Sequence, residues 1–237
     1  GLGDVYKRQK DESGYSTGGD TGTLIAAGGY DGAGIGGRKK KDGEESDACA
    51  GTSDITITGG QIKAGSLIET NKEYPQTEQG GAGIGGGDDG VGKNIRITDH
   101  ADVTAYGGNQ GAGIGGGPHR GGSVEISGNA KVFAMGANDG AGIGSGYDCS
   151  CWGNHPELVD TSVTISENAE VMAVGSYRAA AIGNGASSEQ GKTTVTITGG
   201  TVTAIGGKSS IDYVNGNCYK SLASAIGGGN SDEVQDV

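Results

Sequence analysis

Tryptophan, phenylalanine and proline are scarce in this sequence, which has one Trp, one Phe and 3 Pro among its 237 residues. Glycine, by contrast, occurs 53 times. This composition is not that of an ordinary two-layer domain, and such a glycine content without a period is typical of disordered chains. The first question is therefore whether the glycines are periodic.

Cysteine is also scarce, with 4 residues: Cys49, Cys149, Cys151 and Cys218. That is too few for a disulfide framework in a chain of this length. Cys149 and Cys151 with His155 resemble half of a zinc site, but no second pair follows at zinc-ligand spacing. We expect no metal site and no cofactor, with weak binding of calcium to the acidic surface as the one alternative.

Basic residues and long apolar runs are scarce too. Lys and Arg number 17 against 29 Asp and Glu, which makes the formal net charge −12. Affinity for nucleic acid rests largely on Lys and Arg that neutralise phosphates, so we expect no nucleic-acid partner. No apolar run approaches the roughly 20 residues of a membrane-spanning helix, so we expect no membrane insertion.

What the sequence does have is a recurring glycine-rich phrase. It is Gly-Ala-Gly-Ile-Gly-Gly-Gly at 111–117, with close or degenerate copies at 32–38, 81–87, 140–146, 179–185 and 223–229. The isoleucines of successive copies lie 29 to 49 residues apart, so about 29 residues is the bare repeat. The glycines are thus periodic, which predicts a repeat protein.

Two further phrases lie between consecutive copies, and both predict strands because they alternate with period 2 and are rich in β-branched residues. Residues 124–126 (Val-Glu-Ile) represent the first phrase and residues 132–134 (Val-Phe-Ala) the second. Turns rich in Gly and Asn, which accept positive φ at low cost, separate the two phrases. Three strands and three corners in about 29 residues form one coil of a parallel β-helix.

The domain organisation follows from the repeat. Residues 23–230 are the predicted β-helix domain, residues 10–22 a poorly defined N-terminal segment and residues 231–237 a tail. Residues 1–9 resemble a translated sequencing adaptor from a metagenomic assembly, and we leave them out of the fold prediction. The first coil lacks its first strand. Polar insertions interrupt the repeat at 38–54, 66–80, 145–161 and 208–222.

Alternation also assigns the interior of the coils. The branched residues and alanines of the three strands point inward, and Ile84, Ile114 and Ile143 are expected to stack in one internal ladder. Gly113, between Ala112 and Ile114, then points outward. Two interpretations stay open: the glycine permits tight corners and shallow packing under an overhanging loop, or it forms a flat track that a sugar ring or another chain approaches closely.

No recurring catalytic arrangement is present. Glu125 is the only acid at the outward position of the first strand, so no pair of carboxylates faces out there. Arg96 has no partner that recurs in adjacent coils, and we interpret Asp88, Asp89 and Asp139 as solvated corner residues. The three histidines are scattered, so no nucleophile and base can be paired. We therefore expect no enzymatic activity.

The three phrases together resemble the repeats of large secreted or wall-attached proteins of Firmicutes, described as carbohydrate-binding or right-handed β-helix repeat proteins. The resemblance covers roughly residues 22–229. It implies an all-β fold, a right-handed parallel β-helix (solenoid) of about six coils with three short strands each. It also implies an extracellular or cell-surface location and a polysaccharide or cell-surface glycan as partner, with neighbouring domains of the same protein as a further partner. The first alternative is a structural spacer, and the second is a polysaccharide lyase or hydrolase.

Six outward residues of the second strand form the candidate contact surface. An apolar strip on an acidic, polar rod is unusual, because soluble monomers seldom expose large apolar patches without a role. Three interpretations are open: an insertion at 145–161 or 208–222 covers the strip, the strip is an interface with a subunit or neighbouring domain, or it is a sugar-stacking platform. The six residues are Tyr106, Phe133, Met135, Met172, Val174 and Ile205.

Overall fold

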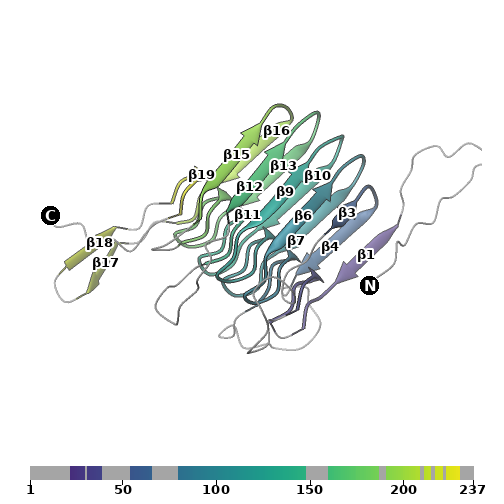
Figure 1. Ribbon diagram of the computed structural model, residues 1–237. Helices are drawn as coiled ribbons and strands as arrows, with labels where there is room; N and C mark the ends of the chain where they lie inside the picture. The colour runs from purple at the N-terminus through teal and green to yellow at the C-terminus, as the bar shows by residue number, and fades with distance from the viewer. Residues whose placement is uncertain are drawn as a thin grey trace, which may run out of the picture.

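Figure 1 shows a computed structural model of the chain as a stack of coils along one axis. The structure describes residues 22–29, 31–38, 54–65, 80–147, 160–186, 191–208, 211–214, 217–220 and 223–229. Within these ranges every coil turns through short strands and tight corners, and no residue is helical. The period-2 strands of the sequence therefore form as expected.

Three sheets run along the axis, each built from one strand per coil. Sheet 1 contains the first strand of each repeat, in the order β3 (Ile55–Ile57), β6 (Gly92–Ile97), β9 (Gly122–Ile126), β12 (Thr161–Ile165) and β15 (Thr193–Ile197). Sheet 2 contains the second strand, in the order β1 (Thr23–Ala26), β4 (Gln61–Gly65), β7 (Asp102–Tyr106), β10 (Lys131–Met135), β13 (Glu170–Val174) and β16 (Thr201–Ile205).

Sheet 3 contains the isoleucine and following glycine of each glycine-rich phrase: β2 (Ile35–Gly36), β5 (Ile84–Gly85), β8 (Ile114–Gly115), β11 (Ile143–Gly144), β14 (Ile182–Gly183) and β19 (Ile226–Gly227). A separate antiparallel pair joins β17 (Ile211–Val214) to β18 (Asn217–Lys220). All pairs within sheets 1 to 3 are parallel, and each strand pairs with its equivalent one repeat away. The fold is a right-handed parallel β-helix, which confirms the predicted fold class.

The number of strands differs among the sheets. Sheets 2 and 3 have six strands each, whereas sheet 1 has five and begins with β3 of the second coil. Among the described residues the first coil therefore lacks its first strand, as the sequence indicates.

The interior consists of ladders of identical or similar side chains. Ile84, Ile114 and Ile143 are direct partners in sheet 3, and all three are completely buried. Other ladders stack Val on Val and Ala on Ala in sheet 2, and Val or Ile on Ile in sheet 1. The predicted inward assignment is confirmed for the strands of sheets 1 and 2 and for the isoleucines of sheet 3. Ala181, which occupies the position of Gly113 in a later coil, is completely buried in the core, so the outward assignment of that position is wrong. At the C-terminal end of the same ladder, Ile226 is 44% exposed.

The glycine track of sheet 3 is not a bare outer face. Gly113 is buried, and a Cβ built on it would lie 2.6 Å from the Gly142 carbonyl oxygen and 2.7 Å from the Met135 nitrogen of the next coil. At Gly115, φ is 134° and a Cβ would lie 2.0 Å from the Gly144 oxygen. Glycine is required because backbone packs directly on backbone. The interpretation as an open track for a sugar is wrong. That of tight packing is confirmed, but the backbone of the next coil, not an overhanging loop, is what packs on Gly113.

The acidic corner residues are not all solvated either. Asp88 is only 2% exposed, and its backbone nitrogen donates to the Asp31 carbonyl oxygen of the previous coil at 2.8 Å. Asp139 binds the guanidinium of Arg178 in the next coil through two hydrogen bonds, at 3.0 and 2.9 Å. The expectation of solvated corners is wrong at these positions, because adjacent coils stack corner on corner and cover the side chains.

Candidate functional site

The outward face of sheet 2 carries three parallel rows of side chains that run along the rod. The sequence places them there because alternation sends every second residue of β7, β10, β13 and β16 out, and the in-register pairing aligns equivalent positions. We name them by their members. The charged row is Asp102, Lys131, Glu170 and Thr201; the central row is Thr104, Phe133, Met172 and Thr203; the apolar row is Tyr106, Met135, Val174 and Ile205.

All six residues of the predicted contact surface lie in the central and apolar rows. The register brings them together as expected, with Phe133 beside Met172 and Met135 between Tyr106 and Val174. Met135, Met172 and Ile205 are 37%, 40% and 46% exposed, and the other three are half-buried. The predicted strip is therefore contiguous along these strands, with Met135, Met172 and Ile205 as its most exposed members.

The two aromatic rings of the strip contact each other across adjacent coils. Their centroids are 5.8 Å apart and their planes are inclined by 59°. This is a tilted packing of the kind that aromatic pairs prefer. Because the rings are not coplanar, Tyr106 and Phe133 cannot both present a face to one flat sugar ring, so any stacking uses one ring at a time.

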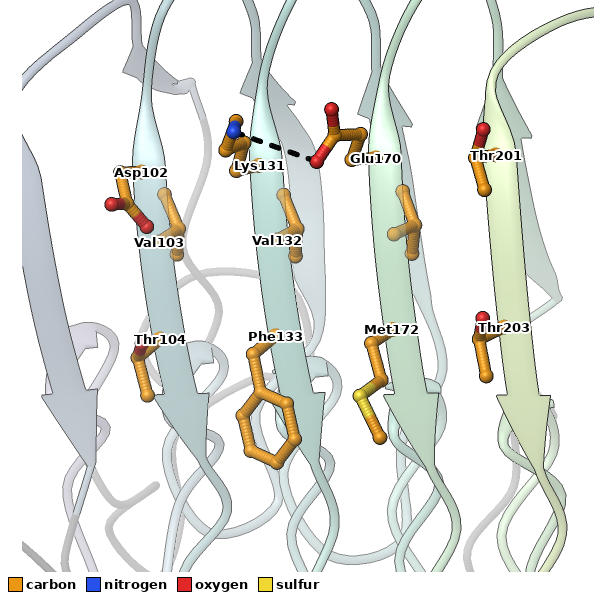
Figure 2. Close-up of a pocket in the computed structure, with 11 residues that line it drawn as sticks. Asp102, Val103, Thr104, Lys131, Val132, Phe133, Glu170, Met172, Thr201 and Thr203 are labelled. Carbon is orange, nitrogen blue, oxygen red and sulfur yellow. Dashed lines mark ion pairs between the residues drawn. The ribbon is translucent and has the colours of Figure 1, made fainter.

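The charged row is the part of the surface that sequence reasoning missed. Its side chains are exposed, and the Lys131 ammonium lies 3.6 Å from the Glu170 carboxylate. Figure 2 shows the charged row and the central row as two lines of side chains across four neighbouring strands. The signal was present in the sequence, since the residue before each inward valine is Asp102, Lys131, Glu170 and Thr201 in successive coils.

A shallow depression of about 520 Å³ lies over these two rows. Asp102, Lys131 and Glu170 line one side, Phe133 and Met172 the middle, and threonines of β7 and β16 its ends. The inward valines of β7, β10 and β13 contribute to its floor. The depression thus combines an apolar centre with polar edges, which is the usual make-up of a ligand site.

Of the insertions that could cover the strip, residues 148–159 of the first and 209–210, 215–216 and 221–222 of the second lie outside the described residues. For β17 and β18 within the second insertion the structure describes the strand pairing. The covering-loop interpretation therefore stays a prediction.

Asp102 and Glu170 are the nearest approach to a catalytic pair on this face. They stand two coils apart, so their backbones are separated by roughly 10 Å, near the upper limit for the carboxylates of an inverting glycosidase. Both are exposed, and Glu170 pairs with Lys131. A general acid needs an environment that favours its protonated form, such as apolar burial, and neither carboxylate has one.

On the outward face of sheet 1, Arg96 does have a partner in the adjacent coil. Its guanidinium donates two hydrogen bonds to the carboxylate of Glu125, at 3.1 and 3.2 Å. Hydroxyl side chains occupy equivalent positions in the later coils, Thr164 and Thr196. The pair is an exposed ion pair, with side chains 60% and 42% exposed.

Among the residues that the structure describes, no cluster of three or more His, Cys, Asp or Glu side chains could hold a metal ion. Cys149, Cys151 and His155, the half-site of the sequence, lie outside the described residues, as does Cys49. A search of the same described residues finds no helix long and apolar enough to cross a membrane.

Comparison with known proteins supports the architecture. A family model described as a beta helix repeat matches residues 95–118, 121–147 and 195–230. No curated protein and no solved structure matches the chain. The matched segments include β7 to β11 and β16 to β19, so the family match and the stacked sheets agree. The chain is a parallel β-helix repeat protein.

Proposed function

We propose that this chain is a non-catalytic glycan-binding or adhesive module that acts outside the cell, and that the outward face of sheet 2 is its contact surface. The observation that carries the proposal is the depression on that face, where an apolar centre of Phe133 and Met172 lies beside the exposed charged row. Sugars present apolar C–H faces and polar hydroxyl edges, and a binding surface for them needs both kinds of group close together.

Rigidity supports the same proposal. The residues of the depression stand on strands whose registers are continuous from β7 to β16. A site on stacked strands keeps the spacing of its side chains without a loop that must be ordered, so binding loses little conformational entropy.

A non-catalytic role fits the chemistry of the described residues. Asp102 and Glu170 are exposed rather than set in an apolar pocket, and Lys131 lies between them with its ammonium paired to Glu170. An open, water-accessible depression also does little to strengthen electrostatic stabilisation of a transition state. Binding without turnover is therefore the simplest use of this surface.

An interface with a neighbouring domain or a second copy is the second candidate. The tilted packing of Tyr106 on Phe133, together with the exposed Met135 and Met172, favours it, because aromatic residues and methionine are enriched at protein interfaces. Such an interface would bury the apolar row more completely than the central row.

Replacing Phe133 and Met172 together by Ser tests the proposal on the full chain. We expect retention on a glycan array to fall about tenfold or more, since the loss of about 1.4 kcal/mol of apolar and aromatic contact corresponds to that factor. Melting temperature should change little, because both side chains point outward. The matched control is the double replacement of Arg96 and Glu125 by Ser on sheet 1, which should leave retention unchanged.

The other interpretations predict different results for the same Phe133 and Met172 variant. Lower stability would support a covering loop, and loss of self-association in sedimentation experiments at unchanged stability would support an interface. Unchanged behaviour in all three measurements would contradict the choice of surface and favour a structural spacer. Release of reducing sugar by the parent chain, abolished by Glu170→Gln, would contradict the non-catalytic role.

A further inference from the structure

The charges of the depression restrict which glycans it can hold. Asp102 and Glu170 bring two carboxylates and Lys131 one ammonium, and the ammonium is 3.6 Å from Glu170. No ion pair or hydrogen bond within the described part of the chain engages the Asp102 carboxylate. The depression is therefore net negative, on a chain whose formal net charge is −12.

A polyanion would meet repulsion on this surface. A glycan carboxylate or phosphate near Asp102 or Glu170 would face a like charge in the depression and in the field of the whole chain. Lys131 only partly offsets this repulsion, because it brings one ammonium against two carboxylates and that ammonium lies 3.6 Å from Glu170. Hydroxyl groups of an uncharged sugar, in contrast, can donate hydrogen bonds to both carboxylates.

The rows also define the direction of a bound chain. Charged and central rows run across β7, β10, β13 and β16, perpendicular to the strands (Figure 2). Four strands at the usual spacing span roughly 14 Å from first to last, the length of about three sugar rings in an extended β-linked chain. A ligand in this orientation has its hydroxyl edge on the charged row and its C–H face over Phe133 and Met172.

We propose that the depression takes an uncharged, extended β-linked glycan that lies along the rod axis, and that it rejects acidic polysaccharides. This inference rests on the proposed function, since it names the ligand class of the same surface. Asp102 and Glu170 accept hydrogen bonds from the sugar hydroxyls. Thr104 and Thr203 offer hydroxyl groups at the two ends of the central row.

Affinity electrophoresis of the full chain in native gels tests the inference. The neutral probes are hydroxyethyl cellulose, xyloglucan and galactomannan, and the acidic probe is polygalacturonate. We expect at least one neutral probe to retard the parent chain, with affinity for polygalacturonate lower by about fivefold or more at low salt, the factor for one like-charge contact in water. Phe133→Ser should weaken retardation by the neutral probe about tenfold.

Glu170→Lys and its matched control Glu125→Lys locate the charge effect. Each replacement removes an acid that pairs with a cation in a neighbouring coil. Glu170→Lys should raise affinity for polygalacturonate about fivefold or more, whereas Glu125→Lys on sheet 1 should not. Mobility is compared with a gel that lacks polysaccharide, which corrects for the change in protein charge.

The outcomes separate the ligand class, the place of the site and the proposed function. Retardation by polygalacturonate but by no neutral probe, or equal gains for the two lysine variants, would overturn the ligand class and leave glycan binding standing. If a neutral probe retards the parent chain and Phe133→Ser changes neither this retardation nor the melting temperature, the glycan site does not lie on sheet 2 and the inference is overturned. No retardation by any probe, with a blank glycan array, would overturn both this inference and the proposed function.

Discussion

Truncating Ile114 in the middle of the rod should destabilise the protein far more than the same change at the end of the same ladder. Ile114 is completely buried between Ile84 and Ile143, its partners in the adjacent coils. Ile226 occupies the equivalent position in β19 but is 44% exposed. Ile114→Ala and Ile226→Ala are thus a matched pair that differs only in burial.

The magnitude follows from burial. Ile→Ala at a fully buried site costs about 2–5 kcal/mol, because apolar area is lost and rigid neighbours leave a cavity. At the half-exposed Ile226 the side chain has less apolar area to lose and no closed cavity forms, so we expect about 1 kcal/mol. For a chain of this size each kcal/mol lowers the melting temperature by about 2–4 °C. Ile114→Ala should therefore melt about 4–20 °C below the parent, and Ile226→Ala about 2–4 °C below it.

Urea denaturation followed by far-UV circular dichroism and by intrinsic fluorescence provides the measurement. Coincident transitions would show that the coils unfold together, which matters because repeat proteins can lose cooperativity between repeats. The ratio of the two destabilisations is the decisive quantity. Equal losses for Ile114→Ala and Ile226→Ala, or a change of only a degree or two for both, would refute the assignment of the isoleucines to a closed interior ladder.

Two further predictions concern glycine and charge. Gly113→Ala should lower the melting temperature by several degrees, because the added Cβ meets backbone atoms at 2.6 and 2.7 Å. The control Gly228→Ala adds a Cβ with nothing within 4 Å and should melt at the same temperature as the parent. Equal melting temperatures for the two variants would contradict direct backbone packing at Gly113. Asp139→Asn should cost about 1.5–3 kcal/mol in urea denaturation, because the Asp139–Arg178 pair has side chains only 15% and 20% exposed. Glu125→Gln breaks a pair that is 42% and 60% exposed and should cost about 0–1 kcal/mol, so the opposite ranking would count against burial as the cause.

The fold was readable from the sequence because its information is local and repeated. Period-2 alternation in phrases such as 124–126 and 132–134 assigns inward and outward residues, and a slip of one residue would expose every inward side chain. The recurrence of Ile84, Ile114 and Ile143 at equivalent places then predicts a stacked ladder. The same alternation correctly placed the six residues of the apolar strip on one face.

The tertiary structure alone decided how the coils meet. Gly113 faces the backbone of the next coil rather than solvent, because the ends of sheet 2 strands lie against sheet 3, a contact between residues distant in sequence. Stacked corners likewise bury Asp88 and pair Asp139 with Arg178. Side-chain rotamers set the tilt between Tyr106 and Phe133, which alternation does not encode. For sheets 1 and 2 the sequence by itself determined which residues face in and which face out, since that depends on backbone period. What each outward residue touches depends on neighbours one coil away, and only the three-dimensional stack brings those together.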